Sequence, residues 1–281
     1  MGATLRTATE RLAATSDTPR LDAELLMAHA LGVSRSDLLL RHMSAPVPES
    51  FAALLARRAE HEPVAHILGE QEFFGLPFRV TPDVLIPRGD SEVLVEAALA
   101  GMPAARRVLD CGTGSGALLL AVLHHLPAAQ GVGIDRSATA LTVAADNAAR
   151  LGLSDRVKLA AANWLQPGWD EGLGQFDLIL ANPPYVEEAA ALSPSVREFE
   201  PAEALFAGPE GLDDYRALVP QLPVLLAPGG VALVEIGATQ AEAVIAIAAA
   251  AGFTVRLRHD LGGRPRALEL KIPLVNGPGS D

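Results

Sequence analysis

Short apolar segments recur through the C-terminal two thirds of the chain, and longer stretches with helical periodicity separate them. From about residue 87 this alternation predicts a doubly wound α/β sheet whose strands run mostly parallel. The seven predicted strands lie at 107–111, 131–134, 157–161, 176–181, 231–236, 254–258 and 267–272. Because a glycine-rich turn joins the last two strands, we expect them to form an antiparallel pair.

A different pattern precedes this sheet. Apolar residues there recur at helical spacing and predict a small helical domain over residues 1–71. These residues are Leu5, Ala8, Leu12, Leu21, Leu25, Met27, Leu31, Leu38, Leu39, Leu40, Phe51, Leu54 and Leu55. Residues 72–86 alternate around Gly75-Leu76-Pro77 and predict a β-hairpin linker, which leaves 87–281 for the sheet domain. The helical domain either grips a substrate or only covers an edge of the sheet.

Composition agrees with a globular protein. The chain has 281 residues, 49% of them hydrophobic, which is enough to bury a full core. Since no uninterrupted apolar stretch reaches about 18 residues and no signal segment is present, we expect a soluble, cytoplasmic protein. Cys111 is the only cysteine, so an internal disulfide is impossible, and the seven histidines lack metal-ligand spacing. We therefore expect no metal site.

The segment Asn182-Pro183-Pro184-Tyr185 directly follows the predicted strand at 176–181. The two prolines stiffen the backbone and hold Asn182 extended at the carboxyl end of that strand. Its amide oxygen and the Pro183 carbonyl can both accept hydrogen bonds from one planar NH2 group, with Tyr185 against its flat face. The segment is thus either a clamp for an amide or amino nitrogen, or a strand end closed by a Pro-Pro turn.

The predicted strand at 107–111 leads into a glycine turn, Gly112-Thr113-Gly114-Ser115-Gly116, and then into a helix. Glycine allows a tight turn and a close backbone approach to a ligand at the carboxyl ends of parallel strands. The next strand ends in Asp135, which is placed to bind ribose hydroxyls and could also cap the helix after it. With Ala117 the turn also fits the permissive dinucleotide pattern, so an NAD enzyme stays open at this point.

The amide clamp distinguishes an NAD-dependent hydride transfer from a methyl transfer to nitrogen. Hydride transfer does not require an amide clamp, whereas methyl transfer to nitrogen can use one. The glycine turn, Asp135 after the second strand and Asn182-Pro183-Pro184-Tyr185 after the fourth strand together resemble a class I S-adenosylmethionine-dependent N-methyltransferase. Within that class the chain is similar to the release-factor glutamine methyltransferases of the HemK/PrmC type. This similarity rests on Gly69-Glu70-Gln71-Glu72-Phe73-Phe74-Gly75-Leu76-Pro77-Phe78, Val84-Leu85-Ile86-Pro87-Arg88, Phe199-Glu200-Pro201, Gly211-Leu212 and Asp260-Leu261-Gly262-Gly263-Arg264.

The resemblance implies a Rossmann-like class I methyltransferase fold. It also implies methyl transfer from S-adenosyl-L-methionine to the side-chain amide nitrogen (N5) of the glutamine in the GGQ loop of peptide chain release factors. It gives catalytic roles to Asn182, Pro183 and Tyr185, which would bind the acceptor together with Pro184. Trp164, after the third strand, would lie near the adenine, or it packs in the core. The implied cofactor contacts are Gly112, Thr113, Gly114, Ser115, Gly116, Asp135, Trp164 and Asn182.

Three residues depart from the family pattern. Gly89 replaces a proline, His66 stands where tyrosine is frequent, and Asn163 stands where aspartate often precedes the tryptophan. We expect Gly89 to loosen its loop, since a proline there would restrict the unfolded chain. The change at Asn163 affects only the expected hydrogen bonding beside the adenine. Asp90 and Ser91 are predicted to cap the helix that follows them.

Charge narrows the choice of acceptor. The net charge is −12, and Lys158 and Lys271 are the only lysines, which disfavours binding to phosphate backbones. An adenine N6 nucleic-acid methyltransferase shares the clamp, but it needs a basic face to hold the strand. We therefore expect a protein glutamine as acceptor, no direct DNA binding and a monomer. A glutamine methyltransferase acting on a ribosomal protein and a non-catalytic binding module are the remaining alternatives.

Overall fold

The computed structural model describes residues 1–273, so the tail that we expect to be disordered, 276–281, lies outside the described residues. The described chain divides into two compact units. The N-terminal unit contains residues 1–71, together with the short segments 80–82 and 192–200. The C-terminal unit contains residues 72–79, 83–191 and the described chain from 201 onward.

The N-terminal unit is helical. Leu12, Leu26 and Met27 are fully buried in its core, which agrees with the helical spacing of apolar residues. The prediction from this spacing that Leu40 is buried was wrong: Leu40 is 80% exposed, because the seven-residue helix that carries it buries only Leu38. Leu21 is also exposed. The helices are α1 (Gly2–Leu12), α2 (Pro19–Leu31), α3 (Arg35–Arg41), α4 (Ser50–Ala59), α5 (Val64–Leu68) and α9 (Pro194–Arg197).

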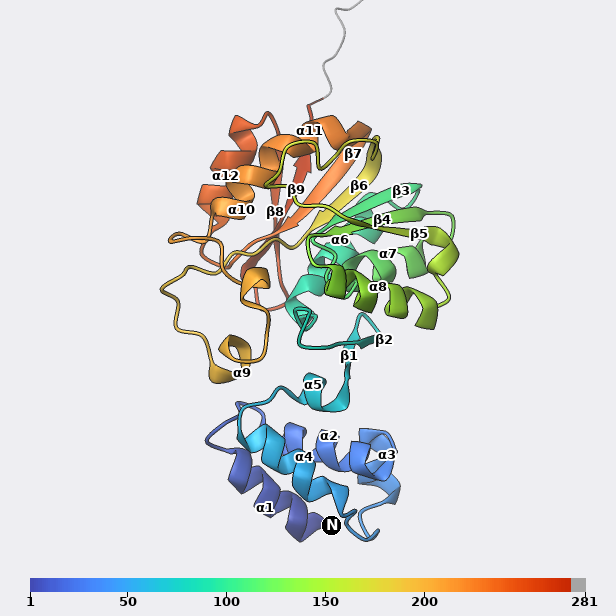
Figure 1. The fold of residues 1–281 in the computed structure, drawn as a ribbon, viewed down its shortest axis with the longest axis vertical. Coiled ribbons are helices and arrows are strands. Elements are labelled where there is room, and N and C mark those ends of the chain that lie inside the picture. The colour runs from blue at the N-terminus through green and yellow to red at the C-terminus, as the bar shows by residue number, and fades with distance from the viewer. Residues whose placement is uncertain (274–281) are drawn as a thin grey trace, which may run out of the picture. The chain divides into compact units, whose positions relative to one another are not determined.

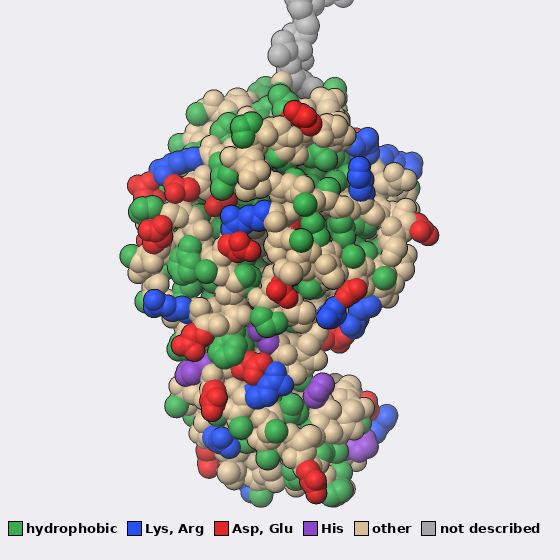
Figure 2. All heavy atoms as spheres, viewed as in Figure 1, with side chains coloured by type: hydrophobic (Ala, Val, Ile, Leu, Met, Phe, Trp, Pro, Cys, Tyr) green, Lys and Arg blue, Asp and Glu red, His purple; other side chains and the backbone are tan. Residues whose placement is uncertain are grey.

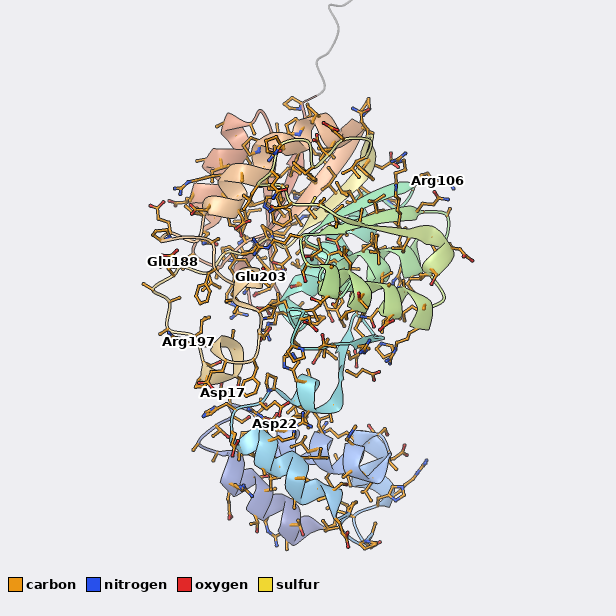
Figure 3. All side chains as sticks on the ribbon, in the orientation of Figure 1. Asp17, Asp22, Arg106, Glu188, Arg197 and Glu203 are labelled. Atoms are coloured by element: carbon orange, nitrogen blue, oxygen red, sulfur yellow. The ribbon has the colours of Figure 1, made fainter. Side chains whose placement is uncertain are left out.

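A buried ion pair ties α2 to α4. Asp22 of α2, labelled in Figure 3, accepts a hydrogen bond from Nε of Arg58 of α4 at 2.7 Å. The same carboxylate accepts from the hydroxyls of Ser16 and Thr18 at 2.7 and 3.0 Å. Because several donors satisfy it, this charge can be buried at little cost, and its role is structural.

A β-hairpin occupies part of the predicted linker. Its strands are β1 (Glu70–Phe73) and β2 (Leu76–Arg79), joined by the two-residue turn Phe74-Gly75. Both turn residues have positive φ, 51° and 74°, as the favoured two-residue hairpin turns require. The hairpin spans residues 70–79, so it begins and ends earlier than the predicted 72–86. The chain after it continues as a loop into the 3-10 helix η1 (Gly89–Ser91).

The C-terminal unit is built on a seven-stranded sheet, as predicted (Figure 1). The strands are β3 (Arg107–Cys111), β4 (Gln130–Asp135), β5 (Val157–Ala161), β6 (Phe176–Ala181), β7 (Leu226–Glu235), β8 (Thr254–His259) and β9 (Pro265–Lys271). Their order is β5-β4-β3-β6-β7-β9-β8. The first five are parallel, and β9 is antiparallel to both β7 and β8, which confirms the expected final pair.

Helices cover both faces of this sheet (Figure 1). One face packs against α6 (Glu92–Gly101), α7 (Ala117–His125) and α8 (Ala138–Arg150). The other packs against α10 (Asp213–Leu218), α11 (Leu222–Leu225) and α12 (Ala241–Ala250). Adjacent strand residues alternate between the two cores, as Val108 and Leu109 do. Burial on both faces explains why these strands appear in the sequence as continuous apolar runs.

Prolines interrupt the helical segment before β7. Between α10 and α11 the chain forms the 3-10 helix η4 (Val219–Gln221), which contains Pro220, and Pro223 lies inside α11. Proline removes a backbone donor and breaks a continuing helix, so this segment is divided into short pieces. Within residues 1–273, the structure contains no helix long and apolar enough to cross a membrane.

Candidate functional site

The carboxyl ends of four neighbouring strands meet at one edge of the sheet. Cys111 of the central strand β3 is level with Ile134 of β4 and with Ala181 of β6. Ala181 is in turn level with Val234 of β7. The next residues along the four strands are Gly112, Asp135, Asn182 and Glu235. Parallel sheets bind ligands at this edge, so the register assembles a site from four distant parts of the sequence.

The glycine turn after β3 has the backbone conformation that glycine favours. Gly112, Gly114 and Gly116 have φ of 76°, 53° and 82°. A Cβ at Gly112 would lie 3.1 Å from Cη2 of Trp164, so a side chain there would press on the tryptophan ring. A Cβ at Gly116 would lie 2.9 Å from a methyl group of Leu120. The first glycine keeps the turn open at its ligand side, and the third lets α7 pack closely.

Asp135 joins the glycine turn to the end of β4. One of its oxygens accepts a hydrogen bond from the N–H of Gly114 at 2.9 Å, and the other accepts from the N–H of Ser137 at 2.9 Å. The helix cap is Ser137 itself, whose hydroxyl accepts from the N–H of Ala140 at 3.2 Å. Burial raises the pKa of Asp135, and the two N–H donors oppose that shift. Each carboxylate oxygen keeps a lone pair for a ligand hydroxyl.

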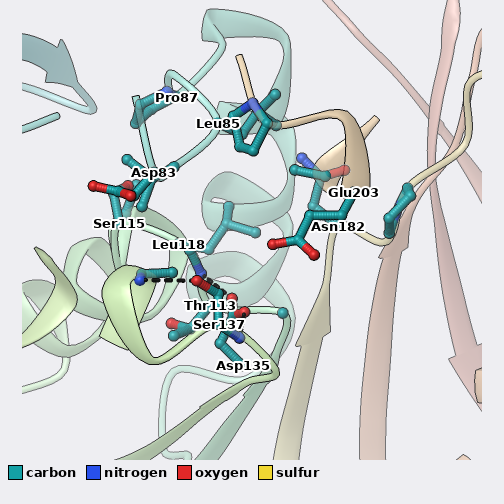
Figure 4. Close-up of a pocket in the computed structure, with 18 of the residues that line it drawn as sticks. Asp83, Leu85, Pro87, Thr113, Ser115, Leu118, Asp135, Ser137, Asn182 and Glu203 are labelled. Carbon is teal, nitrogen blue, oxygen red and sulfur yellow. Dashed lines mark hydrogen bonds between the residues drawn. The ribbon is translucent and has the colours of Figure 1, made fainter. Parts of the chain in front are cut away.

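A cavity lies in front of the glycine turn (Figure 4). In Figure 4, Asn182 and Glu203 lie across it from Thr113 and Ser115. Asp135 also lines it, as do Gly112, Gly114, Trp164 and Pro184. Of the site residues expected from the sequence, Gly116, Pro183 and Tyr185 do not line this cavity. The structure therefore brings most of the expected cofactor contacts together around one space.

Trp164 is held in place from two sides. Its indole N–H donates to a carboxylate oxygen of Asp214 at 2.9 Å, and its ring lies close to Gly112. It lines the cavity while also contacting the apolar core beside α10, so both roles considered for it are compatible. The side-chain oxygen of the neighbouring Asn163 accepts from the N–H of Leu165 at 3.0 Å, and Asn163 does not line the cavity.

Asn182 and Tyr185 each contact a side chain that the sequence did not indicate. Nδ2 of Asn182 lies 3.5 Å from the hydroxyl oxygen of Ser91. The Tyr185 hydroxyl donates to Oε1 of Glu235 at 3.3 Å, and burial together with the Glu235 charge raises the pKa of that phenol. The Tyr185 carbonyl accepts from Nε2 of Gln240 at 2.9 Å, which fixes the backbone after the two prolines.

The expected capping roles of Asp90 and Ser91 are wrong. Neither η1 nor α6 has a side-chain cap in the structure. Asp90 instead forms an ion pair with Arg266 of β9 at 2.8 Å, and Ser91 is buried next to Asn182. Asp90 and Ser91 therefore contact Arg266 of β9 and Asn182 after β6, and neither caps the helix.

Two buried carboxyl groups, Asp110 and Glu235, were missed because each is the next-to-last residue of an apolar run that we assigned to a strand. Asp110 accepts from the hydroxyl of Thr113 at 2.7 Å and so braces the glycine turn. Burial raises the pKa of each carboxyl to about 7. The available signal was a lone acidic residue at the carboxyl end of a buried strand. Within the described residues no cluster of His, Cys, Asp or Glu could hold a metal ion.

Family comparisons cover both units of the chain. Residues 3–69 match the model of the PrmC N-terminal domain, and residues 104–248 match that of a methyltransferase domain. A release factor glutamine methyltransferase of Cereibacter sphaeroides is 45% identical over 96% of this chain and 97% of its own length. One from Geobacter sulfurreducens is 47% identical over 83% of this chain and 82% of its own length.

Solved structures agree with the fold. The ribosomal protein L11 methylase of Lactobacillus delbrueckii subsp. bulgaricus has a TM-score of 0.51 and 25% identity, and covers 69% of this chain and 84% of its own. A methyltransferase of Pyrococcus furiosus has a TM-score of 0.54 and 18% identity, and covers 78% of this chain and 98% of its own. The sheet and its helices are thus shared with methyltransferases of distant sequence.

Proposed function

This chain belongs to the release factor glutamine methyltransferase family, and on that premise we propose that it methylates N5 of the glutamine in the GGQ loop of peptide chain release factors. The methyl donor in this proposal is S-adenosyl-L-methionine. The observation that supports the proposal best is the position of Asn182, which lines the same cavity as the glycine turn and Asp135. A cytoplasmic monomer is part of the same proposal.

The residues around the cavity fit this cofactor. The open face of Gly112 and the ring of Trp164 provide a flat, apolar wall for a purine. Asp135 has acceptor capacity left for two ribose hydroxyls. When bound, S-adenosylmethionine supplies an electrophilic methyl group on a positively charged sulfur. The acidic side chains Asp83, Asp135 and Glu203 line the cavity, together with the basic side chains Arg88 and Arg136.

Asn182 and Pro183 would position the acceptor. An amide nitrogen is a weak nucleophile because its lone pair is delocalised, so it must be held in line with the methyl group. Such positioning can contribute roughly 7–11 kcal/mol to lowering a barrier. The side-chain oxygen of Asn182 and the Pro183 carbonyl would accept the two N–H bonds of the glutamine. They would also stabilise the positive charge that develops on its nitrogen.

The proposed reaction needs no strong base before methyl transfer. A methylated amide cation is very acidic, so its proton can leave to solvent after the transfer. The role of Asn182 and Pro183 is therefore orientation and electrostatic stabilisation, and a base with a matched pKa is unnecessary.

A ribosomal-protein glutamine is the second candidate acceptor; the similar Lactobacillus protein is a methylase of ribosomal protein L11, so a related fold acts on a ribosomal protein. Nucleic acid is a weaker candidate. On the face shown in Figure 2, Lys and Arg side chains form separate small groups among acidic ones, and the whole chain carries a net charge of −12. A continuous basic surface is the usual requirement for holding a strand.

The direct test is methyl transfer from labelled S-adenosylmethionine to a purified release factor. We expect label on the wild-type factor and none on a factor whose GGQ glutamine is replaced by alanine. Ribosomal protein L11 and an adenine-containing oligonucleotide serve as parallel acceptors. Label on the alanine control, or preferential label on either alternative acceptor, would contradict the proposal.

We propose that residues 1–71, which form most of the N-terminal unit, recognise the protein substrate, since none of them lines the cavity. A fragment that begins at Glu72 should still bind S-adenosylmethionine and should lose most activity on the intact release factor. Calorimetry shows whether the fragment is folded and binds the cofactor. Full methylation by a cofactor-binding fragment would mean that these helices only cover the sheet.

A further inference from the structure

Glu235 is a buried carboxyl group that the fold does not satisfy. It ends β7 after the apolar residues 231–234, and it is 1% exposed. Among the described residues, its Oε2 atom has no hydrogen-bond partner. Arg266, the nearby cation, is instead paired with Asp90 and lies 3.6 Å from Asp260. An incompletely satisfied buried carboxyl destabilises a fold, so stability alone gives no reason for an acid at this position.

The partners of Glu235 all lead to the amide clamp. Tyr185 donates its hydroxyl proton to Oε1 at 3.3 Å. Ser91 also lies beside this carboxyl and opposes the rise of its pKa, as a hydroxyl that donates to it would, and the Ser91 oxygen lies 3.5 Å from Nδ2 of Asn182. One carboxylate thus connects to Asn182 and to Tyr185, two of the residues to which we assign the acceptor amide.

The hydrogen-bonding capacity of Glu235 and Ser91 determines which end of the Asn182 amide faces Ser91. A carboxylate can only accept hydrogen bonds, so in a bond between Ser91 and Glu235 the serine hydroxyl donates its single proton. The Ser91 oxygen can then only accept, and it selects the NH2 end of the Asn182 amide. The carbonyl end of Asn182 is left for the acceptor, and this is the end that an N–H donor needs.

We propose that Glu235 is a positioning residue for the methyl acceptor: through Ser91 it fixes which end of the Asn182 amide faces the substrate, and it holds Tyr185 directly. This inference rests on the proposed function, because it assigns Asn182 to the glutamine amide. Glu235 itself contacts no substrate in this proposal. Residues that orient a site in this way typically affect activity by about 10–100-fold when changed.

Protonation of Glu235 would remove its control over the orientation of the Asn182 amide. Burial raises its pKa to about 7, and a protonated carboxyl can donate a proton to Ser91 and release the Asn182 orientation. Turnover should therefore fall as the pH drops through about 7. The other charged or titratable groups that face Glu235 are Asp90 of η1, Arg88 before it, Tyr185 after β6, Tyr215 of α10 and Arg266 of β9.

The test is Glu235→Gln, because glutamine keeps the size of the side chain and can donate to Ser91. We expect kcat for the release factor to fall roughly 10–100-fold, with S-adenosylmethionine affinity within about twofold of wild type. The thermal midpoint should be unchanged or higher, because an incompletely satisfied buried acid is removed. The pH dependence of kcat near 7 should disappear.

Two further variants complete the test. Ser91→Ala should lower kcat to a similar extent, and the double variant should be little worse than either single variant. Asp110→Asn changes the other carboxyl with a pKa of about 7. Because Asp110 braces the glycine turn, this change should weaken cofactor binding and leave the pH profile of kcat in place.

The outcomes are distinct. Wild-type kcat and an unchanged pH profile in Glu235→Gln would overturn the positioning role, while wild-type methylation of the release factor would still support the proposed function. Loss of folding in Glu235→Gln would leave the decision to Ser91→Ala, where normal kcat overturns the inference. If the wild-type enzyme does not label the release factor, it is the proposed function that fails.

Discussion

Replacing Asp135 by alanine should weaken S-adenosylmethionine binding by about a hundredfold or more. In the structure each oxygen of this carboxylate accepts one backbone N–H and keeps a lone pair toward the cavity. Two hydrogen bonds to ribose hydroxyls are therefore available, and bonds to a charged acceptor contribute about 1.5–3 kcal/mol each. Losing both costs about 3–6 kcal/mol, and every 1.4 kcal/mol is a factor of ten in affinity.

Part of this loss comes from the glycine turn, because Asp135 also holds the N–H of Gly114 at 2.9 Å. Asp135→Asn separates the two effects. Asparagine has one acceptor oxygen and one NH2 group, so it cannot hold both backbone N–H groups and both hydroxyls. We expect its affinity to lie between those of wild type and the alanine variant.

Isothermal calorimetry with S-adenosylmethionine and with S-adenosylhomocysteine measures these losses. The two ligands share the ribose and differ in the positive charge, so an equal loss for both assigns the effect to the hydroxyls. Asp146→Ala, which removes a half-buried acid, paired with Arg79, on the helix after Asp135, is the matched control and should leave affinity within about twofold. Unchanged affinity in Asp135→Ala, or binding of NADH in place of S-adenosylmethionine, would refute the reasoning.

Three further predictions concern Asn182, the loop that contains Gly89, and the two buried acids. Asn182→Ala should lower kcat about 10²–10³-fold with little change in cofactor affinity, and Asn182→Asp should retain more activity because a carboxylate still accepts hydrogen bonds; equal kcat for wild type and alanine would argue against the clamp. Gly89→Pro should raise the free energy of unfolding by about 0.4–1 kcal/mol, measured by urea titration, since Arg88 is already extended and a Cβ at Gly89 meets no atom within 4 Å; a lower urea midpoint would count against it. Burial raises the pKa of Asp110 and Glu235 to about 7 from 3.8 and 4.5, so the folded state binds more protons than the unfolded state between those values, and stability should fall as the pH rises through this window. Urea titrations at several pH values should show a flatter dependence in Asp110→Asn and Glu235→Gln, and a steeper one would contradict the assignment.

The sequence by itself determined the strands, their order along the chain and the two motifs at their ends. These features are local. A strand buried on both faces is a run of apolar residues, two adjacent prolines stiffen whatever precedes them, and a glycine turn after a strand permits positive φ. The observed φ values of Gly112, Gly114 and Gly116 are of this kind. Glycine is also typical just after a helix, and α2 is followed by Gly32, whose φ is 68°.

Only the tertiary structure decided which side chains meet. By local rules Asp90 and Ser91 preceded a helix and were expected to cap it, but Arg266 and Glu235 lie beside them in the fold and take those side chains. The helical spacing included Leu40, but it did not show that α3 is too short to bury it. A hydrogen bond or ion pair depends on distance in space, and strands far apart in sequence become neighbours only when the sheet forms. The proposed amide clamp is therefore visible in four consecutive letters, while the residues that we propose to orient it are brought to it only in the folded chain.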